Sequence, residues 1–494
     1  MRKQATVHLI PLQIYRSAWR RLQPAVSVKG ILKSFGVLMA ALTLSAPYGG
    51  AQTLHNFTGG TDGELPFGGL TAGKNGVLYG TTEYGGVSPA CSNQLGCGTV
   101  FQLMPPTSMS GSWTQSVIYA FPSGKYGGAP LPLASPAVGP NGELYGTTVI
   151  GGAGVGDVYE LRPPSSPGGT WTGTILYTFS SAIGEPQNPQ AGVVIGKNGV
   201  LYGTVQFSGT SPNCPFGSVS YGCGAVYSLT PSASPGGAWT YQTLYTFQGG
   251  SDGAAPQTSL AIGKNGELYG TTPAGGPGSL CTGNNIPGPL FQPQSTGCGT
   301  VFELDPPASA GGAWTERVIY SFQGGRDGGS PNAMVYHEGV LDGSVTFGGN
   351  PKNCGGVGCG GVFRLSPPSE PGDSWTEKVI YSFTSVPDGL FPGAGVVVGK
   401  DGTLYGTTRD GGEKEACLQN PGCGIVFQLK PPQDPDDDWR EDVLQRFTST
   451  DGWRPTSAVA IGEDGNLYGT TLYGGTSTNC IAGCGVIFQT KTQH

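Results

Sequence analysis

Five aspartates are the residues of this 494-residue chain whose spacing most suggests shared chemistry. Each opens a recurring Asp-Gly-x-x-Pro segment, and they are Asp62, Asp252, Asp327, Asp388 and Asp451. Carboxylates that converge on one rim could bind calcium or sugar hydroxyls. The favoured interpretation is structural, because Asp-Gly also builds a tight turn before Pro. The sequence contains no Asp-x-[Asp/Asn]-x-[Asp/Asn]-Gly calcium loop. We therefore expect no resident cofactor and keep calcium as the cation to test.

A second candidate is the longest loop between paired cysteines, which runs from Cys281 to Cys298. It contains Asn284, Asn285 and Phe291, whose amide and aromatic side chains suit a lip that contacts a ligand. A loop that has simply lengthened would look the same.

A third candidate is the pair His337 and Asp342 in a repeat that departs from the others. The pair could be catalytic, but His337 falls in a turn on the opposite rim from the aspartates. Divergence of one repeat is the favoured interpretation. Since His55 and His337 are the histidines of the repeats, Ser-His-Asp or Cys-His catalysis has few candidate bases. We assign no catalytic residue.

The twelve cysteines fall into six local pairs: Cys91/Cys97, Cys214/Cys223, Cys281/Cys298, Cys354/Cys359, Cys417/Cys423 and Cys480/Cys484. The corresponding loop of one repeat, at 151–157, lacks both members, which is expected of bonded partners and not of independent thiols. Two sulfurs per repeat with no adjacent histidine are too few ligands for zinc. We predict six disulfides, which form in oxidising compartments.

Seven repeats position these residues. Six contain Leu-Tyr-Gly, and the seventh has Leu-Asp-Gly at 341–343. Each repeat predicts four short strands, which in the fourth repeat are 259–262, 267–271, 300–304 and 314–322. Asn-Gly or Asp-Gly joins the first two strands in six repeats. This dipeptide favours a type I′ hairpin turn.

The two ends of the repeat array complement each other. The last repeat stops after its third strand at 486–488, and the first segment, 53–57, reads as an isolated fourth strand. Pairing the two would close a ring and leave no exposed sheet edge. We predict an all-β, seven-bladed β-propeller of residues 52–494 with four-stranded blades, closed by the N-terminal strand. An open β-solenoid is the alternative. In such blades the cysteine loops and the Asp-Gly connections share one rim.

The composite motif Gly-x-Leu-Tyr-Gly-Thr-Thr, Gly-Gly, Cys-Gly-Thr-Val-Phe, Trp-Thr, Val-Ile-Tyr-x-Phe resembles the Gloeobacter/Verrucomicrobia tandem-repeat family, also called GloVer repeats. The resemblance covers residues 53–488. It implies a β-propeller-like, secreted bacterial protein and carries no established activity.

Residues 1–51 are predicted to be a signal peptide with a basic leader. Residues 1–33 hold seven basic residues and no acid, and an apolar run follows at 35–46. That run is short for a bilayer span, so we expect no stable membrane insertion after cleavage, with a retained anchor as the alternative. Without the leader, the chain has 18 Lys and Arg against 32 Asp and Glu. This net negative charge disfavours nucleic acid as a partner. We expect a secreted or periplasmic monomer.

Loops held by a rigid scaffold are the usual place for binding. We therefore predict a non-enzymatic protein that binds carbohydrate, or another extracellular partner such as a protein, through its disulfide-stapled rim. The alternative is a carbohydrate-active enzyme, a glycosidase or polysaccharide lyase, because two acids suffice for glycoside hydrolysis. Features present in nearly every repeat favour binding, whereas a single non-repeated acid pair would favour the enzyme.

Overall fold

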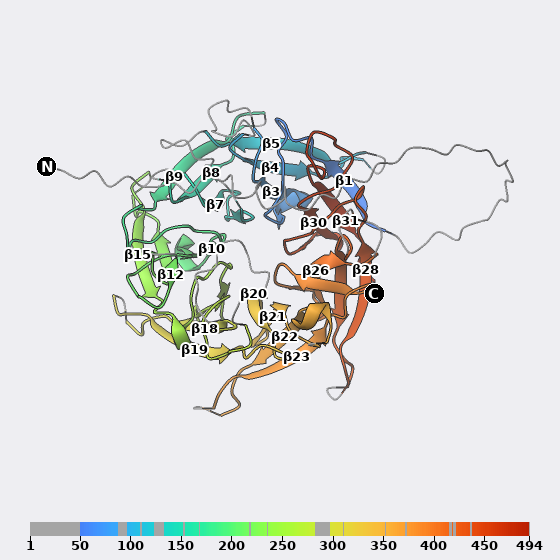
Figure 1. Cartoon of the computed structure of the whole chain (residues 1–494). Coiled ribbons are helices and arrows are strands. Elements are labelled where there is room, and N and C mark those ends of the chain that lie inside the picture. The colour runs from blue at the N-terminus through green and yellow to red at the C-terminus, as the bar shows by residue number, and fades with distance from the viewer. Residues whose placement is uncertain are drawn as a thin grey trace. The chain divides into compact units, whose positions relative to one another are not determined.

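The computed structural model describes residues 50–86, 96–108, 111–122, 133–151, 154–166, 168–216, 219–234, 236–281, 297–309, 311–350, 352–370, 373–413, 417, 421–434 and 437–493. Within residues 48–494, seven antiparallel sheets stand as blades around a common centre, as Figure 1 shows. The predicted seven-bladed β-propeller is therefore confirmed. Almost all of the expected signal peptide, residues 1–49, lies outside the described residues, so it stays a prediction.

Each blade contains four strands, named a to d from the centre outwards. The a strands are β2 (Thr71–Ala72), β6 (Ala137–Val138), β10 (Val194–Ile195), β16 (Ala261–Ile262), β20 (Gly329–His337), β25 (Val397–Val398) and β29 (Ala460–Ile461). The b strands are β3 (Leu78–Thr82), β7 (Leu144–Thr148), β11 (Leu201–Val205), β17 (Leu268–Thr272), β21 (Val340–Phe347), β26 (Leu404–Gly411) and β30 (Leu467–Thr471).

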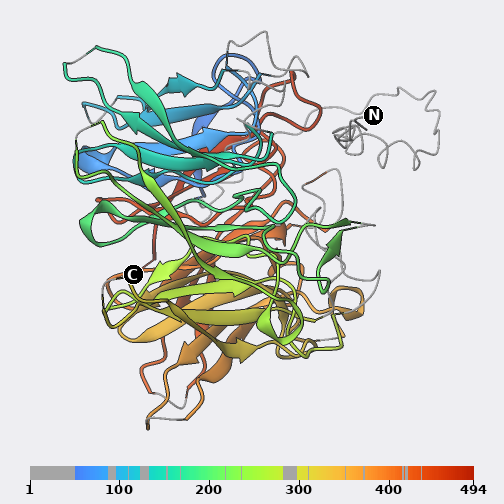
Figure 2. The same cartoon turned by 90° about the vertical axis from the view of Figure 1, so that its left-hand side faces the viewer.

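The outer half of each blade is formed by longer strands. The c strands are β4 (Thr99–Met104), β8 (Asp157–Arg162), β14 (Ala225–Thr230), β18 (Thr300–Asp305), β22 (Gly361–Ser366), β27 (Ile425–Lys430) and β31 (Val486–Thr490). The d strands are β5 (Thr114–Ala120), β9 (Thr172–Thr178), β15 (Thr240–Thr246), β19 (Thr315–Ser321), β23 (Thr376–Ser382), β28 (Arg440–Arg446) and β1 (Gln52–Asn56). Figure 2 shows the blades edge-on, with their strands running between two faces.

Smaller elements decorate the blades. Strand β24 (Gly389–Pro392) extends blade 6, and β12 (Pro215–Phe216) pairs with β13 (Val219–Ser220) in a small hairpin. Four single 3-10 turns are η2 (Lys74–Gly76), η3 (Lys197–Gly199), η4 (Gly250–Asp252) and η5 (Cys354–Gly356).

The ring is closed by the first strand of the propeller. Strand β1 pairs antiparallel with β31, from Gln52 opposite Gln489 to Asn56 opposite Val486. The Phe57 N–H donates to the Gly485 carbonyl over 3.1 Å. Closure between the N-terminal strand and the C-terminal blade is therefore as predicted.

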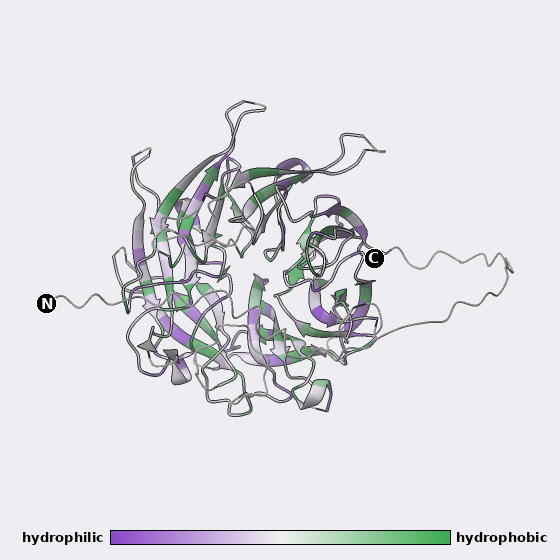
Figure 3. Ribbon diagram, turned by 45° about the horizontal axis from the view of Figure 1, so that its top comes forward, coloured by the Kyte–Doolittle hydropathy of each residue, from purple (hydrophilic) through white to green (hydrophobic). Residues whose placement is uncertain are grey.

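One aromatic contact recurs at every junction between blades. The phenylalanine that follows each d strand is buried and packs edge-on against an aromatic ring of the next blade's c strand. The seven pairs, with centroids 4.9–5.4 Å apart, are Phe57–Phe101, Phe121–Tyr159, Phe179–Tyr227, Phe247–Phe302, Phe322–Phe363, Phe383–Phe427 and Phe447–Phe488. Edge-to-face geometry suits the quadrupoles of both rings. Figure 3 shows the hydrophobic colouring concentrated on the strands that make this packing.

The glycine of Leu-Tyr-Gly leaves the space that the aromatic side chain of the facing c strand occupies. At Gly343 an added Cβ would lie 2.7 Å from Cζ of Phe363, the residue directly opposite on the neighbouring strand. The equivalent glycine of every other blade faces the corresponding ring in the same way. Any side chain at this position would displace the ring from its junction.

A ring of hydroxyl groups ties the inner parts of the blades together. In each blade the first Thr after Leu-Tyr-Gly, or Ser344 in blade 5, donates to a backbone carbonyl of the next blade. The donors are Thr81, Thr147, Thr204, Thr271, Ser344, Thr407 and Thr470, over 2.6–3.2 Å. The last of these reaches Gly68 in blade 1 and so bonds the two ends of the array.

The predicted type I′ turn is correct in two blades and wrong in four. Asn75 and Asn198 both have φ of 58°, as the type I′ turn requires, and each is followed by a positive-φ glycine. In blades 2, 4, 6 and 7 the turn instead closes as glycine N–H to glycine carbonyl, for example Gly142 to Gly139 over 3.1 Å. These four turns carry a carboxylate, such as Glu143, that accepts the N–H of a turn residue. Blades 1 and 3 have valine after the glycine and lack that acceptor.

Replacing Tyr159 or Tyr227 with Phe should stabilise the protein. Both hydroxyls are buried and have no hydrogen-bond partner within the described residues, whereas five blades carry Phe there. Removing an unpaired buried hydroxyl should raise the free energy of unfolding by about 1 kcal/mol for each variant in chemical denaturation. The matched control, Phe302→Tyr, should lose stability by a similar amount, and unchanged stability in all three variants would contradict this reading.

Removing β1 should destabilise the whole ring. A chain that starts after Phe57 exposes the edge of β31 and leaves Phe101 without its neighbour. We expect a much lower melting temperature than in a control truncated after Thr490, the last residue of β31. Equal melting temperatures would show that β1 does not hold the ring closed.

Candidate functional site

The disulfides gather on one face together with the connections between blades. Five are described: Cys214–Cys223, Cys281–Cys298, Cys354–Cys359, Cys417–Cys423 and Cys480–Cys484. Cys97 is also disulfide-bonded, whereas its expected partner Cys91 lies outside the described residues. We call this the disulfide face and its opposite, which carries the a–b and c–d turns, the hairpin face.

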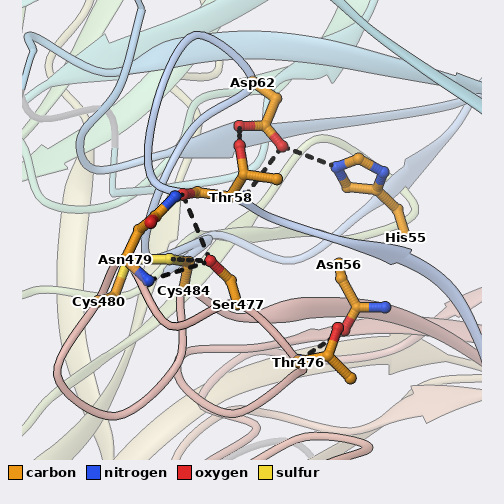
Figure 4. Close-up of a disulfide and its surroundings, with 9 residues drawn as sticks. All are labelled: His55, Asn56, Thr58, Asp62, Thr476, Ser477, Asn479, Cys480 and Cys484. Carbon is orange, nitrogen blue, oxygen red and sulfur yellow. Dashed lines mark hydrogen bonds and ion pairs between the residues drawn. A yellow bond between two sulfur atoms is a disulfide. The ribbon is translucent and has the colours of Figure 1, made fainter.

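The stapled loops brace the start of each connection. In blade 7, Asn479 donates its side-chain amide to the Thr58 carbonyl over 2.7 Å, and Thr476 donates its N–H to Asn56 over 3.1 Å, as Figure 4 shows. Gly59 lies directly against both sulfurs of Cys480–Cys484. Blade 3 repeats this contact, because Asn213 donates to the Gln248 carbonyl over 3.0 Å. The cysteine loops and the Asp-Gly connections therefore share one face.

Five disulfides indicate an extracytoplasmic location, because such bonds persist in oxidising compartments. Among the described residues, no helix has the length and apolar character needed to cross a membrane.

The five repeated aspartates serve their own turns. Each carboxylate accepts the N–H of the residue that follows the buried phenylalanine and a bond from a d-strand side chain. For Asp62 these donors are Thr58 and His55, the latter over 3.2 Å (Figure 4). Asp252, Asp327, Asp388 and Asp451 repeat the arrangement with Tyr245, Tyr320, Tyr381 and Gln445 as d-strand donors. The structure thus gives each aspartate partners within its own connection.

The expectation that these aspartates hold no resident cofactor, with calcium as the cation to test, stays a prediction. Within the described ranges, no three His, Cys, Asp or Glu residues are grouped so that they could hold a metal ion. The predicted ligand lip, Asn284, Asn285 and Phe291, lies outside the described residues.

His337 and Asp342 lie on the hairpin-face side of blade 5, where Asp342 takes part in a contact with the next blade. Asp342 is fully buried and accepts a bond from His337 over 2.6 Å and two from Arg364. The Arg364 guanidinium stacks over Trp439 of blade 6 at 4.9 Å. In five other blades this contact is a Tyr of strand b against the Trp of the next blade, as in Tyr269–Trp375. Asp342 and Arg364 together therefore replace one tyrosine.

Sequence reasoning missed three half-buried acids on the d strands: Glu316, Glu377 and Glu441. Each faces the Asp of the preceding connection, and burial together with that aspartate's charge raises the pKa of each glutamate to about 7. One carboxylate oxygen of each has no hydrogen-bond partner within the described part of the chain. Beside Glu377 and Asp327 lies an open depression of about 490 Å³, also lined by Arg326 and Asn350. The Glu after Trp-x in three repeats was the available sequence signal.

The raised pKa values of these three glutamates predict that the protein is more stable at acidic pH than at neutral pH. Their pKa is higher in the folded than in the unfolded chain, so the stabilisation is complete below about pH 4.5 and is lost as pH rises through about 7. The triple variant Glu316→Gln, Glu377→Gln, Glu441→Gln mimics the neutral acids. We expect its melting temperature to exceed the wild type's at pH 8 and to match it near pH 5.

The control for this experiment is Glu370→Gln together with Glu413→Gln, which alters two exposed acids. It should leave the pH profile unchanged. If the triple variant and the wild type melt in parallel at all pH values, the three acids do not titrate as described.

The inner edge of the disulfide face is the second feature that sequence reasoning missed. It consists of two rows of residues. The first row is the residue before proline in each connection. The second row is the residue that follows the Thr-Thr, Thr-Val or Ser-Val pair after the glycine of strand b. We call these the inner rim. The described residues of the first row are Leu65, Asn188, Ala255, Ser330, Phe391 and Arg454, and those of the second are Glu83, Val149, Gln206, Pro273, Thr346, Arg409 and Leu472. The two rows bond directly, for example Leu472 N–H to the Arg454 carbonyl over 3.0 Å.

The first row adopts an unusual backbone. All six of its described residues have φ between 54° and 64°, the left-handed region where glycine is least strained. None of them is glycine, although the chain contains 88. Two are the bulky residues Leu65 and Phe391.

Charged and amide groups are unevenly distributed around the inner rim. Blades 6 and 7 provide Arg409, Asp410 and Arg454, joined through Asp410 over 2.8 and 3.4 Å. Blade 3 provides an amide cluster in which Asn188 and Gln190 both donate to Gln206, over 2.8 and 2.9 Å.

Blade 1 provides the acid pair Glu64 and Glu83, which no other blade repeats. Burial, with a smaller contribution from the Glu64 charge, raises the pKa of Glu83 to about 7, and burial raises the pKa of Glu64. The inner rim therefore combines a cationic, an amide and an acidic sector on one scaffold.

Known proteins resemble this chain in sequence family and, weakly, in structure. The model of the Gloeobacter/Verrucomicrobia repeat matches residues 90–357, 216–433 and 352–494. No curated protein matches the sequence. Solved structures with a similar chain path include a candidate gluconolactonase (12% identity, 90% of this chain, 92% of that chain, TM-score 0.37). Others are a luciferin-regenerating enzyme (10%, 87% and 92%, 0.38) and a candidate glucose dehydrogenase-type oxidoreductase of Thermus thermophilus (16%, 72% and 95%, 0.38).

Sequence identities and TM-scores this low do not support any inference about activity. The repeat matches, in contrast, cover most of the chain and agree with the repeated sequence motif. This protein belongs to the Gloeobacter/Verrucomicrobia repeat family.

Proposed function

We propose that this protein is a secreted, non-enzymatic propeller that binds carbohydrate through the inner rim of its disulfide face. The observation that carries the proposal is the left-handed backbone of the first rim row. Holding a non-glycine residue there costs about 1–3 kcal/mol, and glycine would avoid the cost. Ala255 is fully buried, but the other five side chains are partly exposed, and side chains retained against such strain are expected to do something that glycine cannot.

The composition of the rim favours a sugar ligand. The seven junctions need the same packing, and they use nearly the same residues, but the rim residues differ from blade to blade. Amides, carboxylates and guanidinium groups there offer hydrogen bonds to hydroxyls, and Phe391 offers an aromatic face. A few placed polar groups beside aromatic rings are typical of small-molecule sites. Secretion is supported by the disulfides and by the leader expected in residues 1–51.

The test is a glycan array followed by titration calorimetry on the oxidised protein from residue 50 onwards. We expect the wild type to bind a defined glycan class and Phe391→Ala to weaken that binding about tenfold, the loss of one stacking contact. Met104→Ala is the matched control, because Met104 is an exposed apolar residue at the hairpin-face end of β4. It should bind as the wild type does, with or without calcium. Absence of binding to any glycan would refute the proposal.

An enzyme is the second candidate, because Glu64 and Glu83 are a non-repeated acid pair with raised pKa values. The same glycans are therefore incubated with the protein and examined for hydrolysis or lyase products. We expect none. Turnover that disappears in Glu83→Gln would replace the binding proposal with a carbohydrate-active enzyme.

A further inference from the structure

Two arginines of the inner rim share a single aspartate. Arg409 donates its Nε to Asp410 over 2.8 Å, and Arg454, from the next blade, donates its Nε to the other oxygen over 3.4 Å. The Asp410 side chain is 6% exposed, whereas those of Arg409 and Arg454 are 32% and 26% exposed. The buried aspartate therefore anchors two guanidinium groups that still reach solvent.

Aromatic rings fix the orientation of both guanidinium groups. Arg409 lies over Phe391 at 5.3 Å and Arg454 over Trp453 at 5.2 Å. Phe391 in turn packs on Phe347 at 5.8 Å, and Trp453 on Tyr473 at 5.3 Å. Stacked arginines lose little freedom when they bind a ligand, because the planes are already set.

The cluster has one positive charge in excess. Both arginines use only Nε for Asp410, and within the described ranges their terminal amino groups donate no hydrogen bond. The four terminal amino groups have no acceptor among the described residues, so they can donate to a bound anion or to water. This excess is local, since acidic residues outnumber basic ones in the chain, 32 to 25.

The neighbouring sector selects for a weakly charged anion. Tyr473, which packs on Trp453, lies close enough to Arg454, Glu83 and Glu64 for the charges of all three to act on its hydroxyl. Those two acids would repel a doubly charged phosphate monoester more strongly than a singly charged group. A carboxylate carries one negative charge and matches the planar fork of a guanidinium.

We propose that Arg409 and Arg454 form a carboxylate-binding site and that the ligand is an acidic polysaccharide containing uronic acid. This inference rests on the proposed function, because it names the class of carbohydrate that the inner rim takes. The guanidinium groups bind the carboxylate, and the exposed part of Phe391 contacts the adjoining sugar ring.

The experiment compares each acidic oligosaccharide with its own methyl ester, which has the same sugar backbone and no charge. Oligomers of galacturonate, glucuronate and mannuronate are titrated into the oxidised protein by calorimetry. The wild type should bind at least one acid about tenfold more tightly than its ester, as expected for charge-assisted hydrogen bonds. Higher salt should weaken binding of the acid and leave the ester unaffected.

Arg409→Gln and Arg454→Gln should each abolish the preference for acid over ester. Arg409→Lys keeps the charge without the planar fork and should retain part of it, which also covers the case in which a Gln variant fails to fold. The matched control is Arg364→Gln, because Arg364 also stacks on a tryptophan and bonds an aspartate but belongs to the hairpin side of blade 5. It should keep the wild-type preference.

The outcomes separate this inference from the proposed function. Equal binding of acid and ester, unaffected by the arginine variants, overturns the carboxylate site while glycan binding stands. Tighter binding of sulfated glycans than of uronates also overturns it. No binding of any glycan overturns the proposed function itself.

Discussion

The propeller depends on an aromatic ring lying across a glycine. In every blade the c-strand ring covers the glycine of strand b and packs edge-to-face with the buried phenylalanine of the preceding blade. This contact joins the pairing within a blade to the packing between blades. Because it is repeated at all seven junctions, the relative tilt of neighbouring blades is set by one local geometry. The hydroxyl bonds at the inner ends then fix the same junctions nearer the centre.

Features that repeat could be predicted from the sequence because each copy supports the others. The blade count, the order of strands, the pairing of cysteines and the closing strand all follow from aligning the repeats. The turns show where this reasoning fails: Asn75 and Asn141 lie in the same dipeptide but adopt different turns. The difference depends on Glu143, a neighbour outside the dipeptide, which accepts the Asn141 N–H.

The inner rim could not be predicted because its residues occupy positions that differ from one repeat to the next. In Asp-Gly-x-x-Pro the variable positions carry no pattern, and only the ring brings Arg454 of one blade to Asp410 of another. The aspartate of the motif suggested a ligand site because it repeats, yet its carboxylate accepts hydrogen bonds from its own turn. The acids Glu316, Glu377 and Glu441 could not be identified for a different reason, since their pKa values are raised by burial and by a facing aspartate of the preceding connection, and both arise only in the folded ring.

The pairing of β1 with β31 has a consequence for how the chain reaches its native state. The partners Gln52 and Gln489 lie at opposite ends of the polypeptide, so this sheet has the longest loop to close of any in the propeller. Loop-closure entropy grows slowly with length, but contacts this distant cannot form until the last strand has been made. Strand β1 is therefore synthesised long before its partner β31 and remains unpaired until β31 has been made. Until then blade 7 has an unpaired edge, and a holding factor that covers an exposed strand would be most useful in that interval.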